Sequence, residues 1–527
     1  MTKRRSPLSD IAPSAAETAG QLLDGLRAFS LTTHAPDMIR MLVGTLPRHG
    51  LTPAAAILGA GKAWGDATGL TDNRGSLSYR QLAAATRRLA AALGGIIQPG
   101  DRVALMADDD RFLLIGLGAA CLAGAKIWLV NPRMGSDHLT ACLADNKITI
   151  VIHAPGCADR PSGFTGQLIP TTSFGRLASA VRPGTPVPNL AKHSKIVMLT
   201  SGTTAAPASI PIRRRWAAPL PSLALAGATK VRHGHPTLVC APQFHGYGLA
   251  CTMLCLVTGS PVVLSSALRA AGLAQMNKGG TGRLPWGEAI FEVADRERVH
   301  TIFGVPAHFA SLSSYLTTAK PAAGRAQYVG AIVSGADRLD GDTIRTLQAR
   351  WGPVVTNYYG TTESGTVTMI TGKDLRRRPD SVGRPVAGSR LRIVNEQGTV
   401  LRRGTPGRIR LASPLASVGR ASAWRSWFTT NDIGWVDADG YLYLAGRSGT
   451  ATRMGGEFVD PSQVESVLVQ SPQVVRAQVR VTRDPVMGQR LVAEVWSGVP
   501  VDTDELREQV RRRLGPAAVP ESITVST

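Results

Sequence analysis

Residues 102–130 read RVALMADDDRFLLIGLGAACLAGAKIWLV, and their pattern indicates the fold class. Its first five residues, an arginine followed by four apolar residues, have the length and pattern of a buried strand, and Ile127 to Val130 are a second apolar run. Between them, Phe112 to Ala125 is apolar almost throughout, which predicts a buried helix. A buried strand, a helix and another buried strand are typical of a parallel β-sheet covered by helices.

The same alternation extends along most of the chain. We expect a helix at Tyr79 to Leu93 and further strands at 148–152, 195–199, 237–240, 261–264, 301–303 and 328–333. Beyond about residue 385 the strands shorten and turns multiply, as at 390–394 and 407–411. A last α/β unit begins near Ser448, with helices at 461–470 and 503–514 and strands at 477–481 and 490–496. The predicted fold class is therefore α/β.

Length and composition limit the class of protein. A chain of 527 residues exceeds the roughly 250–300 residues of a single core, so we expect at least two domains. Its 43% hydrophobic and 18% charged residues are typical of a folded protein and argue against long disorder. Six cysteines without a CxxC pair exclude a disulfide scaffold or a zinc module as the main feature, and they favour a reducing compartment.

The net charge of +22 has four interpretations: a nucleic-acid partner, an anionic membrane surface, a phosphate-rich substrate or a compositional bias toward arginine. Basic triples are scattered at 3–5, 213–215, 376–378 and 511–513, as expected of solvated surface charge. No zinc-finger spacing, RNA-binding aromatic strand or basic zipper accompanies them, so we expect no nucleic-acid partner.

No segment predicts secretion or a membrane span. The basic N-terminus is not followed closely by the apolar region of a signal peptide. The most apolar run, Phe112 to Ala125, is shorter than the roughly 20 residues that a span requires. Met38 to Leu46 predicts an amphipathic helix, which either packs on the core or lies on a membrane surface. We expect a cytoplasmic protein, with peripheral membrane contact as an open alternative.

A loop dense in glycine and hydroxyl groups follows the strand at 195–199. Residues 198–207 read MLTSGTTAAP. Such a loop at the end of a strand presents N–H and O–H donors to anionic oxygens, which predicts a phosphate site. By itself the loop is equally consistent with an ordinary Ser/Thr-rich turn. It is not a Walker P-loop, because no Gly-Lys-Ser/Thr follows.

A second stretch, residues 357–365, reads NYYGTTESG. Adjacent tyrosines offer a face for stacking a purine, and Gly360 allows a tight turn. The carboxylate of Glu363 suits Mg²⁺, which usually takes one or two carboxylates and fills its shell with phosphate and water. The alternative is a pair of core tyrosines followed by a helix-capping Thr and Glu.

A third stretch runs from WFTTND at 427–432 to Arg447. A turn at DADG, residues 437–440, and a strand at 441–444 separate Asp432 from Arg447. Such a hairpin brings both side chains to one end, where they suit a ribose diol. The alternative is a surface hairpin with a salt bridge.

Together and in this order, the three stretches resemble the adenylate-forming superfamily, in particular AMP-forming acyl-CoA synthetases. The likeness runs from LSY at 77–79 to the C-terminal end of the sequence. PQFHG at 242–246 is similar to the family's aromatic-His acyl-site motif, and SGA at 334–336 to its adenine-side loop. GGEFVDPSQVE at 455–465 looks like the Gly-Gly-Glu loop that lines the thioester-forming site. Five ordered motifs favour common ancestry over coincidence.

The resemblance implies a fold and a domain organisation. The fold would be a large N-terminal domain of two doubly wound sheets plus a β-barrel-like subdomain, with a small α+β C-terminal lid. We expect a helical segment at 1–70, with a role at a membrane surface as an alternative. The AMP-binding domain would occupy 71–447 and the lid 448–527, with a hinge near Arg447 to Gly449.

The resemblance also implies a two-step reaction. A carboxylate attacks the α-phosphate of MgATP to give acyl-AMP and pyrophosphate, and the CoA thiol then displaces AMP. The substrates would be ATP, CoA and a fatty or other hydrophobic carboxylate, with Mg²⁺ as cofactor. In such a reaction the protein mainly positions the reactants and neutralises charge.

Site residues follow from the matched motifs. The catalytic residues would be Thr204, Glu363 and His245, of which Glu363 would also hold Mg²⁺ and His245 would border the acyl site. The phosphates would be held by Thr362 and by Thr200, Ser201, Gly202, Thr203 and Thr204. Adenine would be surrounded by Gly335, Ala336, Asn357 and Tyr359, and ribose would be held by Asp432 and Arg447.

Three features depart from the family pattern. The phosphate loop continues as AAPAS at 205–209 where the family has Gly-x-Pro-Lys-Gly, which removes a cation at Ala208; Arg213 to Arg215 are candidate substitutes. The hinge position, usually Asp or Lys, is Gly449. The sequence stops at SITVST before the family's Pro-x-Thr-x-x-Gly-Lys segment, and no lysine follows Lys373. We therefore expect a truncated lid and impaired adenylation.

Three hypotheses follow. The leading one is an AMP-forming acyl-CoA synthetase. The second is a degenerate, non-catalytic relative that binds nucleotide, acyl-adenylate or acyl-CoA as a sensor or partner subunit. The third, acyl-AMP formation without transfer to CoA, depends most on the missing lysine.

Overall fold

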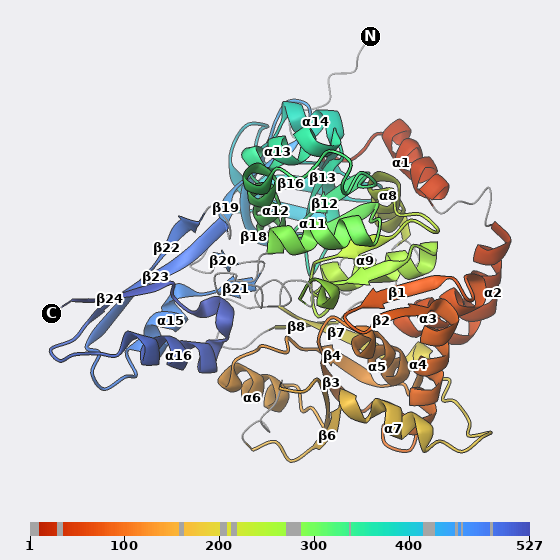
Figure 1. Cartoon of the computed structure of the whole chain (residues 1–527). Coiled ribbons are helices and arrows are strands. Elements are labelled where there is room, and N and C mark those ends of the chain that lie inside the picture. The colour runs from red at the N-terminus through yellow and green to blue at the C-terminus, as the bar shows by residue number, and fades with distance from the viewer. Residues whose placement is uncertain are drawn as a thin grey trace, which may run out of the picture. The chain divides into compact units, whose positions relative to one another are not determined.

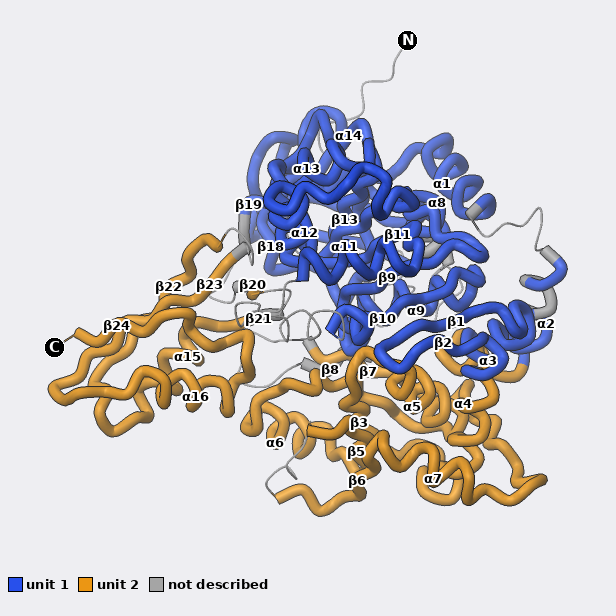
Figure 2. The backbone as a smooth tube through the Cα atoms, viewed as in Figure 1, with its two compact units in different colours: residues 1–47, 56–82, 211–448 blue, residues 48–55, 83–210, 449–527 orange. Residues whose placement is uncertain are grey.

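The computed structural model describes residues 10–28, 35–156, 163–200, 208–211, 219–269, 286–336, 339–414, 427–447, 452–454, 457–484 and 488–526. The chain forms two compact units (Figure 2). Unit 1 comprises residues 1–47, 56–82 and 211–448, and unit 2 comprises residues 48–55, 83–210 and 449–527. Figure 1 labels many of the elements of both units.

Unit 1 is built on one continuous sheet, which has thirteen strands within the described residues, in the order β16-β17-β18-β19-β15-β14-β13-β12-β11-β9-β10-β1-β2. The strands from β1 through β10, β9, β11 and β12 to β13 are parallel, and the remaining pairs are antiparallel. Their bounds are β1 (Thr68–Asp72), β2 (Gly75–Ser78), β9 (Thr237–Val239), β10 (Val262–Leu264), β11 (Thr301–Gly304), β12 (Ala331–Ser334), β13 (Val355–Thr361), β14 (Gly365–Thr371), β15 (Ser381–Pro385), β16 (Arg390–Val394), β17 (Gly407–Ala412), β18 (Phe428–Val436) and β19 (Leu442–Arg447).

Helices cover both faces of the parallel part of this sheet. Because strand residues alternate between faces, Ile302 and Ile332 point to one face, where they join a core cluster with α11, α12 and α13. Phe303, next to Ile302, points to the other face and contacts Tyr247 of α9. The helices associated with unit 1 are α1 (Ala15–Ala28), α2 (Ala35–His49), α3 (Pro53–Ala63), α8 (Pro219–Thr229), α9 (Gly246–Thr258), α11 (Trp286–Arg296), α12 (Pro306–Ala319), α13 (Gly341–Trp351) and α14 (Gly372–Arg377).

The antiparallel end of the sheet encloses its own core. Leu391 and Ile393 of β16 lie opposite Leu411 and Ile409 of β17, and all four are buried together with Tyr359 of β13. Strand β15 links this half to the rest, because it pairs with β14 on one side and β19 on the other. This is the part that the resemblance predicts as a β-barrel-like subdomain.

The N-terminal segment is attached to the same region. Ile11 exchanges backbone hydrogen bonds of 3.1 and 3.0 Å with Leu391. Glu17 of α1 is ion-paired with Arg384 of β15, and the side chain of Gln21 accepts the N–H of Ala387 at 2.7 Å. These contacts join residues that are more than 360 positions apart in the sequence.

Unit 2 contains a second sheet, with the order β6-β5-β3-β4-β7-β8. The five strands from β6 to β7 are parallel, as the opening stretch predicts. The bounds are α4 (Tyr79–Leu93), β3 (Arg102–Met106), α5 (Arg111–Leu122), β4 (Lys126–Leu129), α6 (Ser136–Asp145), β5 (Ile150–His153), β6 (Gln167–Pro170), η1 (Thr171–Ser173), α7 (Phe174–Ser179), η2 (Ala191–His193), β7 (Lys195–Thr200) and β8 (Ala208–Pro211).

Local signals explain the limits of α5. The Asp110 side chain caps the helix by accepting the backbone N–H groups of Phe112 and Leu113. The predicted end at Ala125 was wrong by three residues, because the chain leaves the helix at Ala123 and Gly124 adopts a left-handed φ of 79°.

The C-terminal part of unit 2 has a small sheet and two helices. Strands β22 (Arg476–Asp484), β23 (Gly488–Trp496) and β24 (Ser522–Ser526) form the sheet, beside α15 (Pro461–Leu468), α16 (Thr503–Leu514) and η3 (Pro516–Ala518). A separate hairpin comprises β20 (Thr452–Met454) and β21 (Glu457–Val459). Val464, Leu468, Val495 and Val510 form the centre of this part's core. Strand β24, which pairs in parallel with β23, was not predicted.

The predicted class is confirmed: a large α/β part with mixed sheets and a small C-terminal sheet domain. The predicted domain limits at residues 70 and 447 stay predictions. Among the described residues, every helix is too short or too polar to cross a bilayer.

Candidate functional site

One of the predicted adenine residues, Asn357, lies beside the carboxyl end of the parallel strand β12 in unit 1. Ser334 ends β12 and lies opposite Asn357 of β13 in the parallel register. Both are buried, at 0% and 2% exposure, and within the described part of the chain neither Ser334 Oγ nor Asn357 Oδ1 has a hydrogen-bond partner. Buried polar atoms are usually satisfied, so this pair marks a place for a polar ligand.

The loop after β12 requires glycine at residue 335. A Cβ on Gly335 would lie 2.2 Å from Cζ of Tyr358, because the tyrosine ring packs directly over the glycine backbone. The next residue, Ala336, has a φ of 72°, in the left-handed region that costs a non-glycine residue about 1 kcal/mol or more. The predicted adenine-side loop therefore contains local strain next to a buried aromatic ring.

The two adjacent tyrosines have different surroundings. Each is 7% exposed, and because they are neighbours on β13 they point to opposite faces. Tyr358 lies edge-on to Tyr247, with 5.1 Å between ring centroids. Tyr359 joins the core of the antiparallel half, and its hydroxyl donates to Oδ2 of Asp432 at 2.7 Å. This hydrogen bond joins the second predicted stretch to the third.

The predicted hairpin of the third stretch is confirmed. Asp432 of β18 lies directly opposite Arg447 of β19. The Asp437 side chain closes the turn by accepting the N–H groups of Asp439 and Tyr441, and Gly440 has a left-handed φ of 88°. The structure thus places Asn357, Tyr359, Asp432 and the backbone of Arg447 within one connected set of strands.

Thr362 and Glu363 lie in the tight turn between β13 and β14. Ser364 Oγ accepts the N–H of Thr361 at 3.0 Å, and Gly360 sits so close to Gly365 that a Cβ there would lie 2.0 Å from the Gly365 carbonyl oxygen. The alternative of a helix cap is wrong, because a strand follows the turn. Glu363 is half-buried, and no described residue forms an ion pair with it.

The carboxylate of Glu363 suits Mg²⁺ only together with the phosphates of a substrate. The described residues contain no group of three or more His, Cys, Asp or Glu side chains that could hold a metal ion. Because Mg²⁺ usually keeps several waters and takes only one or two carboxylates plus substrate phosphates, the lone carboxylate of Glu363 fits it in that mode.

His245 is the N-cap residue immediately before α9, and its ring lies 4.5 Å from that of the buried Phe244. Two residues further on, Tyr247 Oη donates to the carbonyls of Val333 at 2.9 Å and Gly304 at 3.3 Å. Burial, together with Tyr358, holds the pKa of Tyr247 well above its usual value, so the hydroxyl remains a donor. The sequence-based prediction missed Tyr247, although this aromatic residue directly follows the motif at 242–246.

The phosphate loop is described only at its edges. Thr200 ends β7 and Ala208 begins β8. Ser201, Gly202, Thr203 and Thr204 lie outside the described residues, as do Arg213 to Arg215 and Gly449. Their predicted roles stay predictions.

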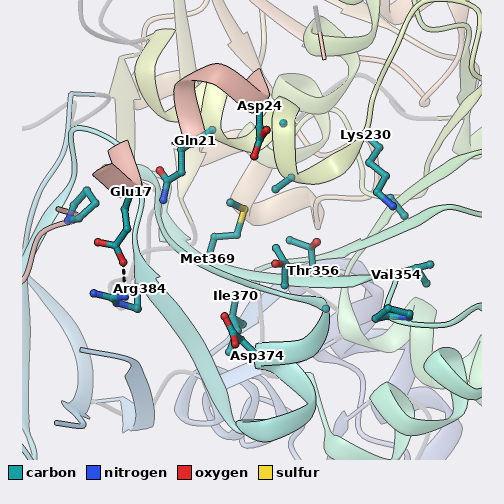
Figure 3. Close-up of a pocket in the computed structure, with 18 of the residues that line it drawn as sticks. Glu17, Gln21, Asp24, Lys230, Val354, Thr356, Met369, Ile370, Asp374 and Arg384 are labelled. Atoms are coloured by element: carbon teal, nitrogen blue, oxygen red, sulfur yellow. Dashed lines mark hydrogen bonds and ion pairs between the residues drawn. The ribbon is translucent and has the colours of Figure 1, made fainter. Parts of the chain in front are cut away.

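Unit 1 also has a cavity of about 380 Å³ at the opposite edge of its sheet (Figure 3). It is lined by α1 and α8 and by residues at the amino ends of β12 and β13, such as Ala331 and Val354. Figure 3 shows Glu17 paired with Arg384 on one wall and Lys230 on another. Since the two ends of parallel strands lie at opposite edges of a sheet, this cavity is separate from the predicted nucleotide site.

Comparison with known proteins assigns the family. The model of the AMP-binding enzyme family matches residues 59–419, and that of the AMP-binding enzyme C-terminal domain matches residues 463–527. Feruloyl-CoA synthase from Amycolatopsis sp is 26% identical over 477 residues, which cover 87% of this chain and 91% of that protein. Long-chain-fatty-acid–CoA ligase FadD13 from Mycobacterium tuberculosis is 26% identical over 453 residues, covering 82% and 85%.

A solved structure shares the fold. The amide bond synthetase McbA from Marinactinospora thermotolerans matches with a TM-score of 0.74 and 24% identity, covering 90% of this chain and 96% of that chain. Because the two family models together match most of its length, the chain belongs to the family of AMP-binding enzymes.

Proposed function

We propose that the protein is an AMP-forming acyl-CoA synthetase that acts on a fatty or other hydrophobic carboxylate. Family membership supports an adenylate-forming enzyme. Two relatives that match it over most of their length, a feruloyl-CoA synthase and a long-chain-fatty-acid–CoA ligase, are both named as enzymes that act with CoA. Their different acids leave the substrate class of this chain to be measured.

The hydrogen bond between Tyr359 and Asp432 is the observation that carries the proposal. It fixes the strand bearing Asn357 against the hairpin bearing Asp432 and Arg447. Asn357 Oδ1 is an acceptor suited to the exocyclic amine of adenine, and the carboxylate of Asp432 suits a ribose diol. One connected set of strands thus offers groups for both halves of adenosine.

The proposed reaction has two steps. A substrate carboxylate oxygen forms a bond to the α-phosphorus of ATP as the bond to pyrophosphate breaks, and the CoA sulfur then attacks the acyl carbon as AMP leaves. Glu363 would hold Mg²⁺, which neutralises phosphate charge when bound. Thr362, Thr200 and the loop from Ser201 to Thr204 would bind the phosphates, and His245 would border the acyl site.

The direct test supplies MgATP, CoA and a panel of carboxylates to the purified protein. Pyrophosphate release and acyl-CoA mass are followed together, and hydroxylamine is added in a parallel reaction to trap acyl-AMP. Turnover with at least one hydrophobic acid is expected. Bound ATP or acyl-AMP without any turnover would instead favour the non-catalytic sensor.

We also propose that adenylation is slow, because Ala208 stands where the family places a lysine. Ala208→Lys is expected to raise the rate of pyrophosphate release about tenfold, since a cation beside the phosphates stabilises the charge that develops in the transition state. Thioester formation from supplied acyl-AMP should change little. An unchanged release rate would mean that another group already supplies the charge, and Ala206→Lys in the same loop is the control.

Tyr359→Phe tests the adenosine site without changing its shape. Losing a hydrogen bond to a carboxylate should raise KM for ATP about tenfold and leave KM for CoA unchanged. Tyr328→Phe is the matched control, because Tyr328 is 46% exposed. Equal effects of the two variants, or a change in KM for CoA alone, would contradict the role given to Tyr359.

The cytoplasmic location and a peripheral contact with a membrane stay predictions. Neither is needed for the proposed reaction.

A further inference from the structure

One face of the β16–β17 hairpin concentrates positive charge. Arg392 of β16 lies directly opposite Arg410 of β17, and Arg408 lies opposite Val394. Since residues alternate between the two faces of a strand, Arg390 shares a face with these arginines. We name Arg390, Arg392, Arg408 and Arg410 the arginine face. The residues between them point to the buried core that contains Tyr359, so the arginine face points away from the predicted nucleotide site.

Among the described residues, one carboxylate is ion-paired with arginines at one end of this face. Asp10 pairs with Arg390 at 3.4 Å and also with Arg392. These two arginine side chains are only 31% and 30% exposed. Their charges are therefore screened less than those of fully exposed side chains.

At the other end of the arginine face, the described partners of the arginine side chains are neutral groups, or there are none. Arg408 donates to the Thr430 carbonyl at 3.4 Å and to Asn431 Oδ1 at 3.5 Å. Within the described part of the chain, Arg410 has no hydrogen bond or ion pair, and the Nε atoms of Arg408 and Arg410 are buried without a partner. Counted over the described residues, four guanidinium groups and one carboxylate leave a net charge of about +3 on this face.

Two other partly buried arginines of this chain are each paired with two carboxylates. Arg325 pairs with both Glu292 and Asp295, and Arg378 pairs with both Asp437 and Asp439. On the arginine face, arginines outnumber the carboxylates that pair with them among the described residues. This is notable because like charges directly opposite each other on paired strands are destabilising. Such an arrangement is expected where an anion completes the charge balance.

Trp427 orients part of the face. The guanidinium of Arg392 lies 4.2 Å from the centre of its ring, and that of Arg390 lies 5.2 Å away. A guanidinium held over an aromatic face is preorganised, so less conformational entropy is lost when it binds a ligand.

We propose that the arginine face is a binding site for a phosphate group, separate from the proposed catalytic site. The planar fork of arginine matches two phosphate oxygens at once, which the point charge of lysine does not. The phosphate belongs either to a soluble molecule or to a lipid headgroup, since both present the same oxygens.

The first experiment titrates the full chain with inorganic phosphate by calorimetry, at constant ionic strength and with AMP saturating the nucleotide site. Arg408→Gln/Arg410→Gln should weaken binding about a hundredfold, or about tenfold for each charge-assisted interaction. Arg402→Gln/Arg403→Gln removes the same charge from the turn of the same hairpin and should bind as the unmodified protein does.

Two further variants separate recognition from folding and from general charge. Arg410→Lys keeps the charge but not the fork, and its affinity should fall between those of the unmodified protein and the double variant. Asp10→Asn removes the competing carboxylate and should strengthen phosphate binding. A merely structural role for the cluster predicts no such gain.

A second experiment identifies the source of the phosphate. The protein is floated with phosphatidylcholine vesicles that contain or lack phosphatidylglycerol. Flotation with the anionic vesicles alone, lost in Arg408→Gln/Arg410→Gln and kept in the control, assigns a lipid headgroup; saturable phosphate binding without flotation assigns a soluble ligand. The proposal is overturned if the unmodified protein binds neither, or if the control variant loses binding equally.

Discussion

Glu363→Gln is expected to lower kcat/KM for pyrophosphate release about a hundredfold or more. The substitution keeps the size of the side chain and removes the one negative charge that the proposal assigns to Mg²⁺. Removing a single electrostatic contact to a transition state typically costs about a hundredfold to a thousandfold in rate. The Mg²⁺ concentration needed for half-maximal activity should rise in parallel, which a purely structural effect would not cause.

The control for this variant is Glu396→Gln, because Glu396 is an exposed residue of a turn after β16. Its activity and Mg²⁺ dependence should match those of the unmodified protein. If Glu363→Gln keeps full activity, or loses it with an unchanged Mg²⁺ dependence, the assignment of the metal to Glu363 is wrong.

Gly335→Ala is expected to abolish nucleotide binding and to destabilise the fold by about 1–3 kcal/mol. The new Cβ would lie 2.2 Å from Tyr358 Cζ and 2.5 Å from its hydroxyl oxygen. The ring has little room to move, because Tyr358 is 7% exposed and lies against Tyr247. The loop that carries Ala336 must therefore shift, and calorimetric ATP binding and the urea midpoint report the two effects.

Two further variants test whether the clash with Tyr358 causes these two effects. Gly324→Ala is the control, since nothing lies within 4 Å of a Cβ there. Tyr358→Ala, combined with Gly335→Ala, removes the clash and should restore part of the ATP affinity. Full affinity in Gly335→Ala alone would show that the loop accommodates a side chain and that its geometry does not matter.

The sequence was sufficient to predict those helices and strands whose bounds depend on a local pattern of residues. Strand β3 and helices α4 and α16 have the predicted bounds, because an apolar run or an amphipathic period fixes each of them. The hairpin that carries Asp432 and Arg447 was also predictable, since the turn from Asp437 to Gly440 joins two short strands. The direct pairing of Asp432 with Arg447 was not, because it depends on a register shift between Ile433 and Gly434.

Contacts between distant segments were not predictable in this way. The hydrogen bond from Tyr359 to Asp432 joins residues 73 positions apart, and the ion pair from Glu17 to Arg384 joins residues 367 apart. Such contacts depend on how the strands are ordered in the sheet, which no local pattern encodes. The orientation of Tyr358 over Gly335 has the same origin, and so does the role of Tyr247 in joining α9 to two strand ends.

In the proposed function, this chain activates a carboxylate by forming an acyl-adenylate. The most direct measurement uses a hydrophobic carboxylate labelled with ¹⁸O in both oxygens, with MgATP and CoA, and follows AMP by mass spectrometry. The proposed reaction transfers one labelled oxygen to the phosphate of AMP, because that oxygen attacks the α-phosphorus and stays there when the thiol displaces AMP. AMP that carries one ¹⁸O together with acyl-CoA is the predicted result; unlabelled AMP, or ADP with inorganic phosphate, would contradict it.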